Sequence, residues 1–240
     1  MQRHTILHED EHLLIVHKPA GLLTIPDRFG NTDSLQAALE RDFGKVFVVH
    51  RLDRETSGLL CFARNEEAHR HLSMQFEHHT ADKFYLVLVE GIVHQEEGEI
   101  DKPIGPHVQI AGKMAISAQG KASLTFYRVL ERFKQFTLLE ARIKTGRTHQ
   151  IRVHFQSIGY PLAVDELYGR RPAFLLSEIK GKNYRSGKYT EEERPMMERT
   201  SLHSSRLRID HPATGERIEF QAELPKDFNA VLNQLRKWGK

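Results

Sequence analysis

The sequence predicts an α+β protein with a central, largely antiparallel sheet and flanking helices. Strand-like segments often follow one another directly along the chain, which is typical of hairpins rather than of alternating strands and helices. Amphipathic helical segments lie between some of them, and no repeat of fixed period occurs. The 240 residues, 39% hydrophobic and 28% charged, fit one large globular domain, so we expect a single domain over residues 1–240.

The first part of the chain is predicted to contain a hairpin, two helices and three further strands. Polar residues 8–12 between two apolar runs predict a hairpin over 5–19. Asp33 and Asn65 are placed to cap the two helices, and the second helix has apolar residues at every fourth position. The other strands are expected at the apolar runs 46–49, 59–63 and 83–90.

The middle of the chain begins with a region that is expected to lack regular structure. Residues 91–120 are rich in Gly, Pro and His and predict surface loops. Two strands are expected at 123–129 and 136–143. A helix is predicted over 148–157, and Gly159 would stop it.

The last part of the chain is predicted to contain an insertion, a hairpin and a closing helix. Residues 170–200 are polar, first basic and then acidic, which indicates an insertion. A hairpin is expected over 206–220, with its turn at 212–215. The closing helix places four apolar residues on one face, namely Phe228, Val231, Leu232 and Leu235.

Composition limits the environment and the partners of the protein. Cys61 is the only cysteine, so an intramolecular disulfide and Cys-rich zinc sites are excluded. No apolar run approaches the ~20 residues that span a bilayer, and the first residues do not resemble a signal peptide. We therefore expect a cytoplasmic protein without membrane contact. The net charge of +3, from 35 Lys and Arg against 32 Asp and Glu, permits a polyanionic partner without requiring one.

Residues 8–12, HEDEH, match the H-E-x-x-H motif of zinc proteases in letters only. The motif needs both histidines on one face of a helix, whereas this stretch lies between two strand-like runs. No third ligand follows at a suitable spacing, so a solvated turn is the preferred interpretation and no metal is expected. A zinc base deaminase is excluded because its P-C-x-x-C element is absent.

The stretch HRLDRETSG, residues 50–58, places charged side chains between two runs apolar enough to be buried strands. Charge at such a junction is costly unless it is paired or used. One interpretation is a surface turn whose local ion pairs contribute little. The other is that Asp53, sheltered beside arginines, stays ionised and acts as a nucleophile.

A second polar stretch, KTGRTHQIRVH at residues 144–154, joins a glycine turn to a predicted helix. Arg147 at the turn and the helix N-terminus are together suited to hold a phosphate. His149, Arg152 and Gln156 recur at helical spacing, so their side chains are predicted to point into one place. The alternative is an ordinary capped amphipathic helix with a basic exposed side.

Several stretches, taken together, resemble the RluA-type RNA pseudouridine synthases. HRLDRETSG and GRTHQIRVH are similar to two motifs of that family. Further family motifs are resembled, in the same order, by ILHEDEHLLIVHKPAGLLTIP, KFYLVLVEG, GYPLAVDELYG and the late LHSSRLRIDHPATGE. The resemblance covers most of the chain.

The resemblance implies the pseudouridine synthase fold, with an RNA-binding cleft between two lobes. It also implies an isomerisation of uridine in RNA to pseudouridine without cofactor or metal. By position, Asp53 is the catalytic aspartate that attacks the nucleoside, and Tyr85 is the active-site tyrosine against the flipped base. Arg152 corresponds to the basic residue that pairs with the aspartate.

Basic residues are expected to bind the RNA. The resemblance assigns Arg51 to a contact near the position that the target base vacates. Further residues suited to bind RNA, chiefly by neutralising phosphates along the cleft, are Arg54, Lys144, Arg147 and His149.

RNA is therefore the expected partner, with ribosomal RNA preferred over transfer RNA as the substrate, and we expect a monomer. The opening motif begins within the first ten residues, so the S4-like domain that many relatives carry before it is expected to be missing. The 170–200 insertion either contacts RNA through basic residues such as Arg170 and Lys188 or is a mobile solvated loop. A competing hypothesis for the whole protein is an RNA-binding or folding module whose catalytic activity is dispensable.

Overall fold

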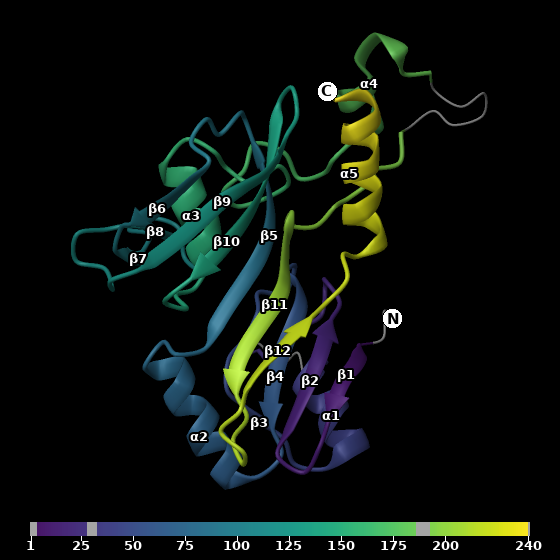
Figure 1. Cartoon of the computed structure of the whole chain (residues 1–240). Coiled ribbons are helices and arrows are strands. Elements are labelled where there is room, and N and C mark those ends of the chain that lie inside the picture. The colour runs from purple at the N-terminus through teal and green to yellow at the C-terminus, as the bar shows by residue number, and fades with distance from the viewer. Residues whose placement is uncertain (1–3, 28–32, 186–192, 240) are drawn as a thin grey trace. The chain divides into compact units, whose positions relative to one another are not determined.

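The computed structural model describes residues 4–27, 33–185 and 193–239, and Figure 1 shows the arrangement of its elements. The strands are β1 (Thr5–Glu9), β2 (Leu13–Lys18), β3 (Phe47–Val48), β4 (Ser57–Ala63), β5 (Asp82–Glu90), β6 (Glu97–Asp101), β7 (Ile104–Pro106), β8 (Met114–Ile116), β9 (Leu124–Arg132), β10 (Phe136–Ile143), β11 (Leu202–Asp210) and β12 (Arg217–Gln221). The helices are α1 (Leu35–Phe43), α2 (Glu66–Glu77), α3 (Gln150–Ser157), α4 (Leu176–Lys180) and α5 (Lys226–Trp238), with a short 3-10 helix at Gly181–Asn183.

Within the described residues, ten strands form one mixed sheet. The strand order is β1-β2-β4-β11-β5-β10-β9-β6, with β3 also paired to β4 and β12 to β11. The hairpin neighbours β1 and β2, β9 and β10, and β11 and β12 are antiparallel, whereas β4 and β11 run parallel. The α+β fold with a largely antiparallel sheet that the sequence predicts is therefore confirmed.

The chain divides into two compact units, and the first is drawn from Met1–Tyr85 and His203–Glu223. In its core, apolar side chains of β2 and β4 pack with Ala68 and Leu72 of α2. Asn65 caps α2 as predicted, because its side-chain oxygen accepts a hydrogen bond from Ala68 N at 2.8 Å. The cap and the buried face together fix this helix on the strands that flank the HRLDRETSG stretch.

The second unit is drawn from Leu86–Leu202 and Leu224–Lys240. Its core includes aromatic and aliphatic residues of β10, such as Phe136 and Leu138, together with residues of α5. The closing helix buries the four residues that the sequence predicts for its apolar face, namely Phe228, Val231, Leu232 and Leu235.

The prediction of surface loops over residues 91–120 is wrong in part, because β6, β7 and β8 lie within this range. β6 pairs with β9, with Glu97 opposite Arg128 and Asp101 opposite Leu124. The β6 sequence, EGEID, has little intrinsic preference for a strand, so its pairing with β9 rather than its propensity determines its structure.

The first helix begins slightly later than predicted. Ser34, not Asp33, is the N-cap of α1, and its hydroxyl accepts a hydrogen bond from Ala37 N at 3.2 Å. Both residue types are good caps, so the sequence alone does not separate two such neighbours.

The ends of the predicted 170–200 insertion are packed into the second unit. Phe174 and Met197 form an antiparallel bridge, and both are buried in the core that contains α5. Arg171 Nε lies 2.8 Å from the Glu90 carboxylate, and its guanidinium lies over the ring of Phe174. These ends are therefore part of the folded unit, while Lys188 lies outside the described residues.

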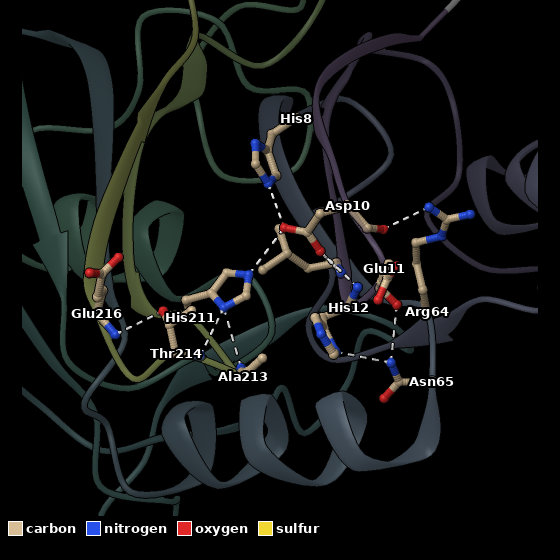
Figure 2. A network of polar contacts seen from close by, with 11 residues as sticks. His8, Asp10, Glu11, His12, Arg64, Asn65, His211, Ala213, Thr214 and Glu216 are labelled. Atoms are coloured by element: carbon tan, nitrogen blue, oxygen red, sulfur yellow. Dashed lines mark hydrogen bonds and ion pairs between the residues drawn. The ribbon is translucent and has the colours of Figure 1, made fainter.

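The prediction of a turn over the HEDEH stretch is confirmed in part, because its first two residues belong to β1 and only residues 10–12 form the turn to β2, which Asp10 organises (Figure 2). The Asp10 carboxylate accepts hydrogen bonds from His12 N at 2.7 Å and Leu13 N at 2.9 Å. The same carboxylate contacts His8 Nε2 at 2.7 Å and His211 Nε2 at 3.1 Å. Because His211 follows β11, Asp10 joins the two hairpin turns of the first unit.

Candidate active site

Asp53 lies in the loop that joins β3 to β4, between the two apolar runs that the sequence indicates. Buried contacts fix the backbone on one side of it: Thr24 Oγ1 donates to Leu52 O at 2.9 Å and accepts from Leu52 N at 3.2 Å. On the other side, Thr56 N donates to Asp53 O at 3.1 Å. The backbone that carries this carboxylate is therefore held before any substrate binds.

Lys18 supports the same loop from the end of β2. Its side chain is fully buried, and Nζ donates to three backbone carbonyls at 2.8–2.9 Å, those of Pro19, Leu22 and Arg54. Gly21 N also donates to Arg54 O at 2.9 Å, and Arg54 Nε donates back to Gly21 O at 3.0 Å. The Pro–Gly segment after the first hairpin thus supports the HRLDRETSG loop through hydrogen bonds.

His50, at the start of this loop, has a structural role. Its Nε2 accepts a hydrogen bond from Cys61 N at 3.0 Å, and its ring stacks on Phe76 with centroids 4.4 Å apart. Burial and the positive charge of Lys83 lower the pKa of His50 to about 3. The ring is therefore neutral near pH 7, as an accepting Nε2 requires.

Tyr85 lies on β5, and only 5% of its surface is exposed. Its hydroxyl is hydrogen-bonded to the side chain of Ser204 on the adjacent strand β11. Burial raises the pKa of Tyr85, the bond to Ser204 lowers it, and the negative charge of Asp53 raises it further, with a net rise. Asp53 and Tyr85 belong to the same unit, and the charge of Asp53 acts on the Tyr85 hydroxyl.

Arg51 and Arg54, the basic residues of this loop expected to bind RNA, are both exposed. Arg54 also has a structural part, because its Nε binds the Gly21 carbonyl and lies 3.7 Å from the Glu55 carboxylate. Its side chain is nevertheless 63% exposed, so much of the guanidinium faces solvent.

Arg152 lies on the first turn of α3 in the second unit, and its side chain is only 10% exposed. Asp165 binds it twice, with Nε to Oδ2 at 2.7 Å and Nη2 to Oδ1 at 2.8 Å. The guanidinium carbon also lies 4.8 Å from the centroid of the Tyr168 ring. Within its own unit Arg152 is therefore paired with Asp165, and the pairing with Asp53 stays a prediction.

The polar side chains predicted to point from α3 into one place do so. His149 Nδ1 lies 2.8 Å from the Tyr168 hydroxyl, and Gln156 Nε2 donates to Tyr168 O at 2.9 Å. Arg152 contacts both Tyr168 and Asp165. All three side chains thus contact residues of the turn that directly follows Val164.

The start of α3 differs from the prediction. The helix begins at Gln150 rather than Thr148, because His149 adopts a left-handed conformation with φ of 56° and no side chain caps the helix. Arg147 N donates to the Gln150 side chain at 3.0 Å, so this amide is already bound within the protein. Phosphate binding at the turn stays a prediction.

Lys144 and Arg147 lie close to this turn. Lys144 follows β10 and is exposed. Arg147 is half-buried, and its Nε donates to Ala122 O at 3.2 Å. Lys144 is therefore the more accessible of the two for a phosphate.

Four residues that hold these side chains in place were not predicted from the sequence, namely Lys18, Thr24, Asp165 and Tyr168. All four lie in stretches that resemble family motifs, namely ILHEDEHLLIVHKPAGLLTIP and GYPLAVDELYG. The resemblance assigns none of them a role, and the Leu52 backbone that Thr24 binds lies 28 residues further along the chain.

Comparison with known proteins decides the family. The family model described as RNA pseudouridylate synthase matches residues 12–157, more than half of the chain. The chain belongs to this family. The synthase is 39% identical over 238 residues to ribosomal large subunit pseudouridine synthase D of Pseudomonas aeruginosa, with 97% of this chain and 72% of the relative covered. It is 37% identical over 243 residues to the uncharacterized RNA pseudouridine synthase YlyB of Bacillus subtilis, with 98% and 73% covered.

Solved structures of pseudouridine synthase domains confirm the fold of the synthase. Human RNA pseudouridylate synthase domain containing 4 matches with a TM-score of 0.74 and 25% identity, covering 96% of this chain and 92% of that chain. Human RNA pseudouridylate synthase domain containing 1 matches with a TM-score of 0.70 and 26% identity, covering 98% and 95%. The synthase is thus an isomerase that acts on RNA, and an RNA-binding module with dispensable catalysis is not favoured.

Among the described residues, no helix has both the length and the apolar character needed to cross a membrane.

Proposed function

We propose that this synthase converts a uridine of ribosomal RNA to pseudouridine and that Asp53 is its nucleophile. The substrate is suggested by relatives named for the large ribosomal subunit, from Pseudomonas aeruginosa and Nitrosomonas europaea, each 39% identical to this chain. The observation that carries the role of Asp53 is its place in a loop that buried Lys18 and Thr24 support on both sides.

The reaction rearranges one nucleoside. The bond between ribose C1′ and uracil N1 breaks, C1′ joins C5 instead, and the proton lost from C5 is balanced by one gained at N1. Substrate and product contain the same atoms, so no oxidant or reductant is consumed. A carboxylate held at a fixed position is suited to attack the nucleoside and to leave again, because little orientational freedom is lost on the way to the transition state.

Tyr85 is proposed to lie against the flipped uracil. A tyrosine hydroxyl is protonated at neutral pH, and the raised pKa of Tyr85 keeps it so over a wider range, so the residue offers both an aromatic face and an O–H donor. Arg152 is proposed to pair with the Asp53 carboxylate.

The RNA backbone is proposed to contact the basic residues that the sequence predicts for this role. Arg51 and Lys144 are the exposed members of this set, and Arg54, Arg147 and His149 add charge or hydrogen bonds beside protein contacts of their own. Contacts of this type weaken with salt, so RNA affinity is expected to fall steeply as ionic strength rises.

We further propose that residues 1–240 act as one catalytic domain with an insertion at 170–200. The match to nearly the whole length of two solved synthase chains supports a single catalytic domain. A monomer in the cytoplasm, without membrane contact, fits an enzyme whose substrate is RNA. Sedimentation of the purified protein tests the monomer.

The proposed function is tested by mapping pseudouridine in large-subunit ribosomal RNA and in transfer RNA after incubation with purified protein. Asp53→Asn keeps the size of the side chain but removes its charge. The wild type is expected to convert a uridine in ribosomal RNA, whereas Asp53→Asn converts none and still binds RNA in a filter-binding assay. Glu55→Gln removes a negative charge from the same loop and serves as the matched control, which is expected to remain active.

Each contrary outcome overturns a different part of the proposal. Conversion confined to transfer RNA overturns the ribosomal substrate and leaves the role of Asp53 intact. Turnover by Asp53→Asn at the wild-type rate overturns the nucleophile. Absence of conversion in both RNAs overturns the substrate assignment altogether.

A further inference from the structure

We propose that Asp165 and Tyr168 are positioning residues that fix the guanidinium of Arg152 in one orientation for the reaction. The inference rests on the proposed function, because it requires Arg152 to act at the nucleoside or at the catalytic carboxylate. The contacts that carry it all lie within the second unit.

Burial makes a partner for Arg152 necessary. Removing a guanidinium from water is costly unless its charge is balanced and its donors are bound. Asp165 meets both needs, because it is a carboxylate with a fully buried side chain and makes two bonds of 2.7 and 2.8 Å to Arg152. Paired, parallel bonds of this kind fix the direction of the guanidinium plane as well as its position.

Asp165 is itself held rigidly. Its Oδ1 accepts hydrogen bonds from Leu167 N and Tyr168 N, both at 3.0 Å. Its backbone is closed into a turn by Gly169 N, which donates to Asp165 O at 2.9 Å. Gly169 fits closely there, since a Cβ on it would lie 2.6 Å from Asp165 O. The carboxylate therefore cannot rotate without breaking backbone contacts.

Tyr168 restrains the guanidinium from a second direction. Its ring centroid lies 4.8 Å from the guanidinium carbon of Arg152, within the range of a cation–π contact. The far end of the ring is anchored, because the hydroxyl accepts a hydrogen bond from Met114 N at 2.7 Å and contacts His149 Nδ1 at 2.8 Å. The position of the ring is thus set by β8 and by the start of α3.

The hydrogen-bonding capacity of Arg152 shows what this arrangement achieves. A guanidinium has five N–H groups, and Asp165 accepts from two of them, one on Nε and one on Nη2. The other three, two on Nη1 and one on Nη2, belong to the part of the group that Asp165 does not bind. Because Asp165 and Tyr168 fix the plane, they also determine where those three donors point. Asp165 therefore acts through Arg152 and is not itself a catalytic residue.

The test measures single-turnover rates on RNA with enzyme in excess, together with RNA affinity and thermal midpoints. The variants are Arg152→Ala, Asp165→Asn and the double variant of the two. Glu166→Gln is the matched control, because it removes the same charge from the next residue, which is exposed. Tyr168→Phe removes only the hydroxyl that anchors the ring, and it supplies a second route if Asp165→Asn does not fold.

We expect Asp165→Asn to slow the chemical step by roughly 10–100-fold, as misplacement of a reacting group by about 1 Å can do, with RNA affinity changed less than about threefold. Tyr168→Phe is expected to slow it by a smaller factor, and Glu166→Gln to leave it unchanged. In the Arg152→Ala background neither substitution is expected to slow the reaction further, because the group that they position is gone.

Other outcomes overturn the inference. An Asp165→Asn rate equal to that of Glu166→Gln, or a double variant slower than Arg152→Ala by the full factor, shows that Asp165 does not act through Arg152. Likewise, if Tyr168→Phe does not slow the wild type, or slows Arg152→Ala by the full factor, then Tyr168 does not act through Arg152. If Arg152→Ala itself reacts at the wild-type rate, the proposed role of Arg152 fails, and this inference fails with it. Failure of Asp165 or Tyr168 to act through Arg152 leaves the proposed function intact, whereas a wild-type rate for Arg152→Ala contradicts the role that the proposed function gives to Arg152.

Discussion

Gly58 and Ser204 lie backbone against backbone where β4 and β11 run parallel. A Cβ on Gly58 would overlap Ser204 O and lie 2.6 Å from Ser204 N. Gly58 also has a φ of +118°, which side chains of L residues rarely adopt. The close approach places the start of β4, which directly follows the Asp53 loop, against β11. Ser204 of β11 is also the hydrogen-bond partner of Tyr85.

We predict that Gly58→Ala strongly destabilises the synthase. The overlap is with backbone, so no side-chain rotation relieves it, and the strained φ adds to the cost; together they are expected to lower the free energy of unfolding by roughly 2–5 kcal/mol. Urea unfolding measures the loss. Gly112→Ala is the control, because Gly112 has a φ of +79° but open space around a Cβ. Equal losses in the two variants would show that the close approach to Ser204 is not the cause.

We predict that Lys18→Met impairs both stability and turnover. Methionine fills a similar volume but leaves the carbonyls of Pro19 and Leu22 without the buried donor, which is expected to cost about 2–4 kcal/mol of unfolding free energy. Loss of the bond to Arg54 O also loosens the loop next to Asp53, so the single-turnover rate is expected to fall by about tenfold or more at a temperature where the variant is folded. A folded variant that reacts at the wild-type rate would contradict the positioning role of this loop contact.

We predict that Tyr85 does not ionise in the pH range where an ordinary tyrosine does. Burial raises its pKa, so its proton is retained above pH ~10, where the unfolded chain loses it. The corresponding stability is fully present below pH ~10 and is lost as pH rises further. Tyrosinate absorbance of the wild type and of Tyr85→Phe is expected to coincide up to about pH 10. A wild-type transition near pH 10 that Tyr85→Phe removes would contradict the prediction.

The sequence predicts the elements whose apolar pattern alone determines their structure. The closing helix is the clearest case, since the four residues on its predicted apolar face are those buried on α5. β10 also matches its predicted range, because the apolar and β-branched residues of Phe136–Ile143 suit a strand that is buried over most of its length. β6 could not be found in this way, because a strand of Glu, Gly and Asp residues with one Ile is stabilised by its partner β9 rather than by its own composition.

In the candidate site, too, some residues can be predicted from local sequence and others depend on distant partners. Asp53 stands out because charge between two apolar runs demands an explanation. The groups that hold the site are harder to predict, since Lys18 binds the carbonyl of Arg54, 36 residues away, and Arg152 binds Asp165, which lies beyond the end of its helix. Such pairs depend on how distant segments pack, and no local pattern in the chain encodes that packing.

A last prediction concerns the acid stability of the first unit, where Asp10 contacts two histidines and two backbone amides (Figure 2). Burial alone would raise the pKa of Asp10, but the hydrogen bonds from His8, His12 N, Leu13 N and His211 outweigh it and lower the pKa well below its usual value. Because the unfolded carboxyl titrates near pH 4, the stabilisation is present above that pH and is lost as pH falls further.

Asp10→Asn is therefore expected to lower the free energy of unfolding by roughly 1–3 kcal/mol at pH 7, because the amide cannot replace the charged acceptor. The difference in unfolding free energy between the variant and the wild type is expected to shrink as pH falls from about 4 toward 2. In this range the Asp10 carboxyl of the unfolded wild type binds a proton, whereas that of the folded wild type stays ionised. Urea unfolding across this range measures it, with the exposed neighbour Glu11→Gln as the control for a lost charge. A difference that stays constant with pH would show that the Asp10 carboxylate stabilises the two turns by its shape rather than by its charge.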